Sequence, residues 1–196
     1  MFHNIPQKVL QRMAFLEEKD RMDRTNGTPR LQRLRQVDPE TGALLAILLA
    51  SSPDGTAAEI GTSAGYSALW LSLGCRAKGR KLHTFELLPE KIALAKETFA
   101  SAGVEDIIRL VEGDAVINLQ SHSNISFAFI DTEKELYHTC YELLIPRMVK
   151  GGLLAADNVE SHGDVLAPFL KAAKNDPRVD ASIIPIGKGL LLCRKV

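Results

Sequence analysis

One segment of the chain changes its periodicity in the middle: Thr56-Ala57-Ala58-Glu59-Ile60-Gly61-Thr62-Ser63-Ala64-Gly65-Tyr66-Ser67. Residues 56–60 form the short apolar run of a buried strand, and helical spacing of apolar residues begins at Tyr66. Gly61 and Gly65 allow the turn between them to approach a ligand closely, and the first amides of the helix point toward it. The segment therefore predicts a strand, a glycine turn and a helix, with a ligand at the turn.

Strands and helices alternate on the C-terminal side of this segment. Short apolar runs predict the strands, and longer amphipathic runs predict the helices between them. The turn Gly187-Lys188-Gly189 joins the last two strands as a hairpin. The expected strands cover 56–60, 81–85, 107–111, 125–130, 152–156, 179–186 and 190–194, and the expected helices cover 66–73, 89–102, 133–149 and 162–175.

Two more helices are expected on the N-terminal side. Apolar residues at helical spacing predict one that starts near Ile5, followed by a polar, arginine-rich stretch at 20–36. Asp38-Pro39-Glu40 has the N-cap, first-turn proline and early acid with which helices begin. The 196 residues fit one domain with a real core. We expect an N-terminal helical arm at 1–36 and a catalytic core at 37–196.

Charge is balanced over the whole chain but segregated along it. Lysine plus arginine number 24, and so do aspartate plus glutamate, which argues against a uniformly basic nucleic-acid binder. Residues 1–35 carry eight basic and four acidic side chains, residues 36–170 ten and eighteen, and residues 171–196 six and two. An acidic middle therefore lies between two basic ends.

The sequence carries no visible targeting or membrane segment. The N-terminus lacks a basic stretch followed by an apolar one, and the longest apolar run, 43–50, is far shorter than the ~20 residues of a membrane span. Cys75, Cys140 and Cys193 form neither a disulfide framework nor a zinc motif. We expect a cytoplasmic protein with reduced thiols and no membrane partner.

Nearly every expected strand of the alternating region ends at an acidic residue. The alternation predicts an α/β, Rossmann-like doubly wound sheet of mostly parallel strands with helices on both faces, where ligands bind beyond the carboxyl ends of the strands. A single acid there can be merely a helix cap, but five such strand ends on one edge favour a binding site. These residues are Glu59, Glu86, Asp114, Asp131 and the pair Asp157-Asn158.

The turn at residues 61–65 matches parts of two familiar motifs. A dinucleotide fingerprint needs glycine where Ser63 stands, which disfavours a NAD-dependent oxidoreductase. The turn also reads G-x-S-x-G, the nucleophile elbow of hydrolases, but helices precede it where that fold needs strands. Glu86, about 20 residues beyond the turn, suits the two hydroxyls of a ribose. A nucleoside without phosphates, such as S-adenosylmethionine, therefore fits best.

Asp131, Asp157 and Asn158 end strands that should be neighbours. Their oxygens are hard ligands, suited to Mg²⁺ or Ca²⁺ rather than zinc, and three of them leave positions for water and substrate. Lys134 follows Asp131 by three residues, and an amine beside a metal can be driven toward its neutral form and act as a base. Taken alone, Lys134 fits a solvated surface amine equally well.

With these motifs the chain resembles the class I S-adenosylmethionine-dependent O-methyltransferases. It is most similar to the cation-dependent group that includes catechol and caffeoyl-CoA O-methyltransferases and their bacterial relatives. The resemblance spans roughly residues 37–196, and Asp131-x-x-Lys134 together with Asp157-Asn158 is specific to the metal-dependent group. The matching segments are 58–67, 85–86, 112–115, 129–134 and 151–159.

The resemblance implies a role for each residue of the site. Glu59, Gly61, Tyr66 and Ser67 would surround the methionine part of the cofactor, Glu86 would bind its ribose, and Asp114 and Ala115 would border its adenine. Asp131, Asp157 and Asn158 would hold the divalent cation, with Asp131 also at the cofactor and in the catalytic machinery, and Lys134 would be the general base. It also implies seven strands with the last antiparallel, and a homodimer.

The implied activity is methyl transfer from S-adenosylmethionine to a hydroxyl of a small, catechol-like or phenolic acceptor. Two departures from the family pattern lie on the acceptor side. The segment Val159–Asp164 leads almost at once into a helix where relatives commonly have a longer insertion, and Lys188 stands where relatives often carry an acid.

Two other functions stay open from the sequence. One is O-methylation of a hydroxylated nucleoside in tRNA, in which the arginine-rich stretch Arg21–Arg35 would contact phosphates, although aromatic residues do not interleave with its arginines. Changes at Arg30, Arg33 and Arg35 would then weaken RNA binding. The other is a non-catalytic protein that binds S-adenosylmethionine. Such a protein would have no need of Lys134 or of the three metal ligands.

Overall fold

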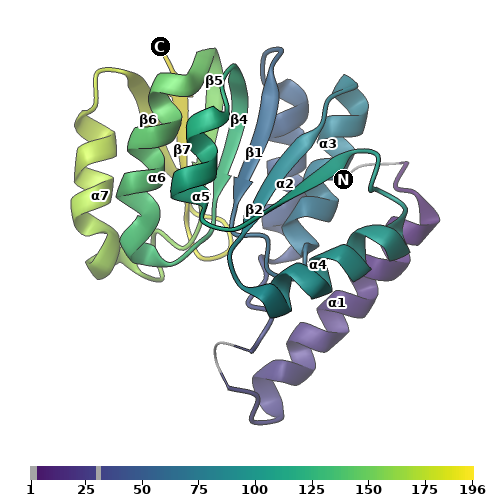
Figure 1. The fold of residues 1–196 in the computed structure, drawn as a ribbon. Helices are drawn as coiled ribbons and strands as arrows, with labels where there is room; N and C mark the ends of the chain where they lie inside the picture. Colours follow the sequence, from purple (N-terminus) through teal and green to yellow (C-terminus); the bar gives the residue numbers. More distant parts are fainter. Residues whose placement is uncertain (1–3, 30–31) are drawn as a thin grey trace.

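The computed structural model describes residues 4–29 and 32–196 (Figure 1). Within these residues, seven strands form one sheet in the order β3-β2-β1-β4-β5-β7-β6. The strands are β1 (Thr56–Ile60), β2 (Leu82–Glu86), β3 (Ile108–Glu112), β4 (Ile125–Ile130), β5 (Met148–Ala156), β6 (Val179–Ile184) and β7 (Leu190–Lys195). The helices are α1 (Gln7–Thr25), α2 (Pro39–Ser51), α3 (Tyr66–Lys78), α4 (Pro89–Ala102), α5 (Ala115–Asn118), α6 (Tyr137–Leu144) and α7 (Gly163–Asn175).

The direction of the strands confirms the expected fold class. Strands β1 to β5 pair in parallel, whereas β7 runs antiparallel to both of its neighbours, β5 and β6. The order of the strands along the chain reverses between β1 and β4, because β2 and β3 lie on one side of this pair and β5 on the other. In open sheets of this kind the ligand crevice forms at that reversal.

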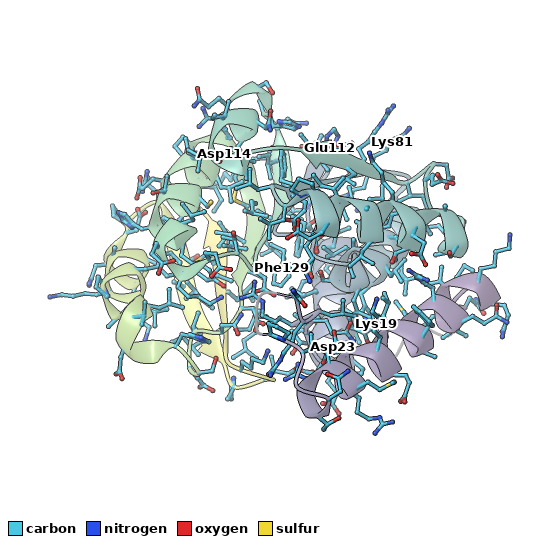
Figure 2. All side chains as sticks on the ribbon, turned by 60° about the horizontal axis from the view of Figure 1, so that its bottom comes forward. Lys19, Asp23, Lys81, Glu112, Asp114 and Phe129 are labelled. Atoms are coloured by element: carbon cyan, nitrogen blue, oxygen red, sulfur yellow. The ribbon has the colours of Figure 1, made fainter. Side chains whose placement is uncertain are left out.

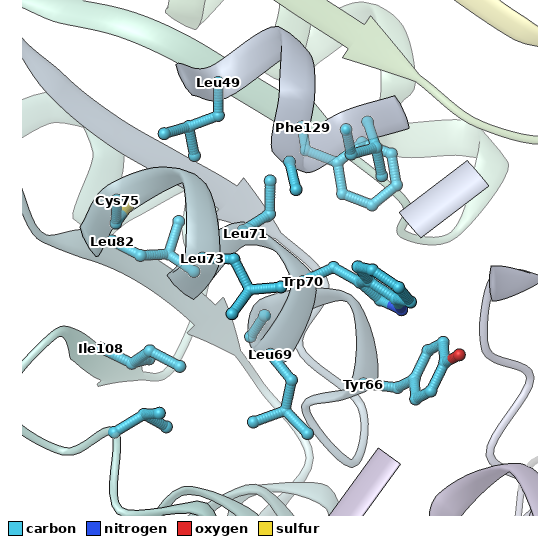
Figure 3. Packing of buried hydrophobic residues seen from close by; sticks show 14 of the residues in the cluster. Leu49, Tyr66, Leu69, Trp70, Leu71, Leu73, Cys75, Leu82, Ile108 and Phe129 are labelled. Carbon is cyan, nitrogen blue, oxygen red and sulfur yellow. The ribbon is translucent and has the colours of Figure 1, made fainter. Parts of the chain in front are cut away.

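The sheet is buried on both faces, as a parallel sheet with helices on either side requires. Along β4, Phe127 and Phe129 pack with α1 to α4 on one face, and Ala128 and Ile130 pack with α5 to α7 on the other (Figure 1). Figure 3 shows Trp70 of α3 packed among aliphatic side chains of the first of these two clusters.

The prediction of one continuous helix over 133–149 is wrong, because only its middle part is an α-helix. The chain forms a 3₁₀ turn at Lys134–Leu136, then α6, and then a second 3₁₀ turn at Ile145–Arg147. Pro146 has no amide hydrogen to continue the helical ladder, which explains why α6 ends before it. Strand β5 therefore begins at Met148, where it pairs with Ile125 of β4, rather than at Gly152.

Helix α1 continues to Thr25, into the polar, arginine-rich stretch that begins at residue 20. Arg12 fastens it to α4 with hydrogen bonds from its guanidinium to Thr98 at 3.0 and 3.1 Å and an ion pair to Glu97 at 3.0 Å (Figure 2 shows α1 with Lys19 and Asp23 labelled). α3 likewise continues to Lys78, and the four-residue helix α5 is an addition to the expected elements. Other element ends shift by at most two residues.

Several local expectations are confirmed. Asp38 caps α2, since its Oδ1 accepts a hydrogen bond from the amide of Thr41 at 2.8 Å. Cys75, Cys140 and Cys193 are free thiols and buried. Among the described helices, none combines the length and the apolar character needed to cross a membrane.

Candidate active site

Backbone hydrogen bonds join the carboxyl ends of the parallel strands. The amide of Gly61 donates to the carbonyl of Phe85, that of Asp131 to Ile60, and that of Asp157 to Ile130, at 3.0 to 3.1 Å. Each of these three residues follows a strand and is bonded to the end of the neighbouring strand. The expected acidic edge therefore has a fixed geometry.

A cavity of about 740 Å³ opens above this edge. That volume lies in the range of sites that enclose a cofactor-sized ligand. The site residues expected from the sequence that line it are Gly61, Tyr66, Ser67, Glu86, Asp114, Ala115, Asp131, Lys134 and Asn158. Glu59 and Asp157 are both buried and do not line it.

The glycine turn has the conformation that only glycine adopts readily. Gly61 has a φ of +96° and Gly65 a φ of +88°. A side chain at position 61 would also overlap the carbonyl oxygen of Asp131, and one at position 65 would meet the ring of Phe99. The turn can therefore lie against β4 on one side while residues 61–64 line the cavity on the other.

Glu59 lies beneath the turn rather than in the cavity. Its Oε2 accepts a hydrogen bond of 2.6 Å from Thr84, whose hydroxyl in turn lies 2.6 Å from that of Thr62. The other oxygen, Oε1, is buried and has no hydrogen-bond partner within the described residues. Burial raises the pKa of Glu59 to about 7. From this position Glu59 supports the turn through the two threonines.

Tyr66 and Ser67 open helix α3 at the wall of the cavity. The hydroxyl of Tyr66 donates to Glu17 of α1 at 2.6 Å, so the N-terminal helix helps to orient this ring. Burial is the main cause that raises the pKa of Tyr66 above its ordinary value, which keeps the phenol protonated. The structure thus places both residues beside the turn, as expected.

Glu86 is oriented by three backbone amides. Its Oε2 accepts from Ser63 at 2.8 Å, and its Oε1 accepts from Leu87 and Leu88, each at 3.0 Å. A carboxylate has about four acceptor sites, so about one is left for a ligand hydroxyl. The carboxylate therefore ties the turn after β1 to the turn after β2 and still faces the cavity.

Asp114 and Ala115 lie at the far end of the cavity, after β3 (Figure 2, with Glu112 and Asp114 labelled). Asp114 caps the short helix α5, because its Oδ1 accepts from the amide of Val116 at 2.8 Å. Asp114 therefore caps a helix and lines the cavity at the same time, so a capping role does not exclude a role in binding.

Asp131, Asp157 and Asn158 are brought together as expected. The Nδ2 of Asn158 donates to Oδ1 of Asp131 at 2.8 Å and to Oδ2 of Asp157 at 3.2 Å. The second oxygen of Asp157, Oδ1, is buried and lacks a partner among the described residues. Burial, reinforced by the charge of Asp131, raises the pKa of Asp157 to about 6, and burial also raises the pKa of Asp131.

Lys134 reaches the same cluster from the loop after β4. Its Nζ donates to the carbonyl of Thr132 at 3.0 Å and to the hydroxyl of Tyr137 at 2.8 Å, and it lies 3.6 Å from Oδ1 of Asp131. Burial lowers the pKa of Lys134, an effect that the nearby carboxylates oppose. With its side chain 15% exposed, it is no solvated surface amine.

Comparison with known proteins identifies this arrangement. The model of the O-methyltransferase family matches residues 13–196. The chain belongs to this family. Caffeoyl-CoA O-methyltransferase from Mesembryanthemum crystallinum is 30% identical over 188 aligned positions, covering 83% of this chain and 74% of that protein. Caffeoyl-CoA O-methyltransferase 2 from Populus trichocarpa is 29% identical over 182 positions, covering 80% and 73%.

Solved structures agree on the fold of the methyltransferase. The SAH-bound methyltransferase PaMTH1 from Podospora anserina superposes with a TM-score of 0.82 at 22% identity, covering 99% of this chain and 90% of that one. The O-methyltransferase from Bacillus cereus in complex with SAH gives 0.78 at 22% identity, covering 93% and 91%. The protein is an S-adenosylmethionine-dependent O-methyltransferase related to the caffeoyl-CoA enzymes.

In this methyltransferase the segment 32–37 covers part of the cavity, which the sequence did not reveal. Lys91 of α4, 3% exposed, donates to the carbonyls of Gln32 and Arg33 at 3.2 and 2.8 Å. The hydroxyl of Ser63, in the glycine turn, donates to the carbonyl of Leu34 at 2.8 Å. The segment is thus fixed to the helix and to the turn that border the cofactor side of the cavity.

These contacts bear on two alternatives raised by the sequence. Ser63, the residue at the nucleophile position of the hydrolase motif, donates its hydroxyl to a backbone carbonyl instead of a histidine. Arg33 donates to the carbonyl of Thr28, and Arg35 pairs with Glu133 at 2.9 Å, so both are engaged within the protein. Arg30 lies outside the described residues.

Tyr137 is a site residue that sequence reasoning missed. Its hydroxyl accepts from Lys134 and donates to the backbone carbonyl of Asp157 at 3.1 Å. It therefore connects the amine to the strand end that carries the carboxylate. The three-residue spacing from Lys134 was the available signal, since a single helical turn brings such residues together.

Proposed function

We propose that this methyltransferase requires a divalent cation, Mg²⁺ or Ca²⁺, and methylates one hydroxyl of a small catechol-like acceptor. The observation that carries the proposal is the buried Oδ1 of Asp157, which has no partner among the described residues. Leaving a buried acceptor unsatisfied costs about 1–3 kcal/mol. A cation at this point would remove that cost.

The chemistry of the donor set supports a hard cation. Two carboxylates and an amide lie in contact, and oxygen ligands of this kind suit Mg²⁺ and Ca²⁺. The nitrogen of the Asn158 side chain now donates to both carboxylates. As a ligand, Asn158 would present its side-chain oxygen instead. The raised pKa of Asp131 and that of Asp157 have the same main origin, which is burial, and the charge of Asp131 adds to the effect on Asp157.

A divalent cation held by Asp131, Asp157 and Asn158 would lower the pKa of the acceptor hydroxyl. Lys134 would accept the proton of that hydroxyl, because its lowered pKa makes the neutral amine more available than in water. Tyr137 would hold the Nζ of Lys134 in place. The deprotonated oxygen would then take the methyl group in line as the carbon–sulfur bond breaks and S-adenosylhomocysteine leaves. Alignment alone contributes up to ~7–11 kcal/mol in well-oriented systems.

The cofactor would extend along the glycine turn. Gly61, Tyr66 and Ser67 would border its methionine part, with Glu59 supporting them from below. Glu86 would accept from a ribose hydroxyl, and Asp114 and Ala115 would border the adenine. Asp131 would touch both the cofactor and the cation, since it lies between the turn and Asn158.

A methyl-transfer assay with labelled S-adenosylmethionine tests the proposal. Catechol, single-hydroxyl phenols and total tRNA would each be offered with Mg²⁺, with Ca²⁺ and with EDTA. We expect transfer to catechol that EDTA abolishes and that is lost in Asp157→Ala. Asp106→Ala, at an exposed loop position, is the matched control.

Several outcomes would contradict this function. Transfer to catechol that is equal with EDTA and with Mg²⁺ would exclude the cation role. Transfer to tRNA alone would show that the acceptor is RNA rather than a catechol. Arg33 and Arg35 give that alternative no specific support, because both are bonded within the protein. Binding of S-adenosylmethionine with no transfer to any acceptor would favour the non-catalytic alternative.

A homodimer is also part of the proposal. The resemblance to dimeric relatives supports it, and α1 presents Leu10, Phe15 and Met22 as exposed apolar side chains. Light scattering on the eluted protein would give twice the mass of the chain for a dimer. A single-chain mass over the working concentration range would exclude it.

A further inference from the structure

Lys188 stands apart from the other basic residues of the cavity. Each of the other described lysines and arginines that line the cavity has a partner in the protein. Arg24 pairs with Asp20, Arg33 with the Thr28 carbonyl, Arg35 with Glu133, Lys91 with two carbonyls, and Lys134 with Thr132 and Tyr137. Within the described residues, the ammonium of Lys188 makes no hydrogen bond or ion pair, although the residue is half-buried and lines the cavity.

The position of Lys188 is set by a rigid turn. The turn between β6 and β7 is bonded to the segment after β5, because Glu160 and Ser161 donate their amides to the carbonyl of Lys188 at 3.0 and 3.1 Å. A side chain at Gly189 would collide with Glu160, and one at Gly187 would collide with Asp38. The turn is therefore packed between α2 and the segment that follows Asn158.

This turn lies on the acceptor side of the site. Ser161 and His162 line the same part of the cavity as Lys188, and neither belongs to the strands that border the cofactor turn. The charge of Lys188 acts on Asp131 and on Asp157, opposing the effect of their burial. Lys188 lines the same cavity as Asp131, Lys134 and Asn158, so an acceptor bound in this cavity can reach its ammonium.

In the loaded site a cation would engage the two carboxylates on which the charge of Lys188 now acts. The carboxylates of Asp131 and Asp157 carry two negative charges, and a divalent cation would balance both. Lys188 and the sulfonium of the cofactor would then add positive charge in a partly dehydrated cavity. A half-buried ammonium in such surroundings is stabilised by an anionic partner, and in this cavity the acceptor can supply it.

We infer that Lys188 selects acceptors that carry a carboxylate on the catechol-like ring and that its ammonium pairs with this carboxylate during methyl transfer. The inference rests on the proposed function, in which the cation binds the catechol hydroxyls. It adds the acceptor carboxylate as a second group that the protein recognises. A charge-assisted hydrogen bond contributes about 1.5–3 kcal/mol, so the preference for an acid over its neutral ester corresponds to roughly ten- to a hundredfold.

The test compares 3,4-dihydroxybenzoate with its methyl ester. Calorimetry with the protein, Mg²⁺ and S-adenosylhomocysteine would give the two dissociation constants, and a transfer assay with S-adenosylmethionine would give the ratio of kcat/KM. We expect the wild-type protein to prefer the acid roughly ten- to a hundredfold and Lys188→Met to bring both ratios close to one. Lys188→Glu should reverse the preference, toward a catechol that carries an ammonium group.

Controls separate charge from folding. Lys171→Met, at an exposed position of α7, should keep the wild-type ratio. Retained binding of S-adenosylhomocysteine would show that each Lys188 variant is folded, with Lys188→Gln as the replacement if Lys188→Met is not.

Each outcome decides between the two proposals. Equal binding of acid and ester by the wild-type protein, or a preference that survives in Lys188→Met, would overturn the inference. A preference that depends on Lys188 without any methyl transfer would support the inference and reject the proposed reaction. If neither compound binds, both are wrong.

Discussion

Gly61 lies so close to Asp131 that a β-carbon on Gly61 would overlap the carbonyl oxygen of Asp131. The amide of Asp131 donates to the carbonyl of Ile60, so the two chain segments are also bonded at this point. The residue that follows β4 and the glycine turn therefore share one fixed contact. In the proposed site, the spacing between the methyl donor and the cation would depend on this contact.

Substitution of Gly61 by alanine should destabilise the protein and abolish cofactor binding. The φ of +96° and the overlap with backbone together predict a loss of roughly 3 kcal/mol or more in the free energy of unfolding. Urea denaturation and calorimetry with S-adenosylhomocysteine would measure both effects. Gly79→Ala is the matched control, because Gly79 also has a positive φ but open space around it, and about 1 kcal/mol is expected there. Equal losses in the two variants would contradict the role of the contact.

Replacement of Lys134 by methionine should lower kcat by about 10²- to 10⁴-fold, the usual contribution of a general base. Binding of S-adenosylhomocysteine should change little. In the wild-type protein, the rate should rise with pH as Lys134 loses its proton. Because burial lowers the pKa of Lys134, the midpoint of that rise should lie below the ordinary lysine value of 10.5. A kcat/KM profile with the same rising limb in Lys134→Met would assign the proton transfer to another group.

Stability should depend on pH through Glu59. Its pKa in the folded protein is about 7, above the ordinary glutamate value of 4.5, so folding favours the protonated acid. The protein should therefore lose stability as pH rises from 4.5 through 7, by up to about 3 kcal/mol from this group. Glu59→Gln should remove this part of the dependence in urea denaturation at pH 5 and pH 8. Glu105→Gln, an exposed control, should keep it. A Glu59→Gln curve parallel to that of the wild-type protein would show that Glu59 ionises freely.

Loss of the Lys91 ammonium should release the segment 32–37 from the cavity. Lys91→Met leaves the part-buried carbonyls of Gln32 and Arg33 without their donor, a cost of at most about 1–3 kcal/mol. Hydrogen exchange should become faster in residues 32–37, and binding of S-adenosylhomocysteine should weaken. Lys96→Met on the same helix removes an exposed ion pair with Glu112, worth at most about 1 kcal/mol, and should change neither. Unchanged exchange in Lys91→Met would mean that other contacts hold the segment.

The edge of the sheet could be predicted because its signals are local. A short apolar run followed by an acid marks a strand end, and parallel pairing then places Glu86, Asp131 and Asp157 on one edge whatever the rest of the chain does. Alternation along β1 also contained a signal that was not used. Glu59 shares a face with Ala57, which packs toward α1 to α4, so its side chain turns into the core and away from the cavity.

Features that depend on distant contacts escaped prediction. The segment 32–37 is held by Lys91, about sixty positions along the chain from Gln32, and no periodicity reports such a contact. The prediction of a helix over 133–149 was wrong for a local reason. Pro146 lacks an amide hydrogen and ends the helix, although the amphipathic pattern continues beyond it. The partnerless state of Lys188 likewise emerges only when the partners of the other basic residues are known.

The backbone hydrogen bonds along the carboxyl edge of the sheet suggest which parts of the enzyme can be exchanged. The strand ends must stay, whereas the loops beside them can be replaced. Gly61, Asp131 and Asp157 are held by main-chain hydrogen bonds between neighbouring strands, which do not depend on what side chains the acceptor loops carry. The segment 159–163 and the turn 185–189 bond to each other through Lys188 and Gly189, and the segment also bonds to the carbonyl of Asn158 at that edge. Replacing these two loops together with the matching pair from a relative should therefore change the acceptor preference and keep the methyl-transfer activity.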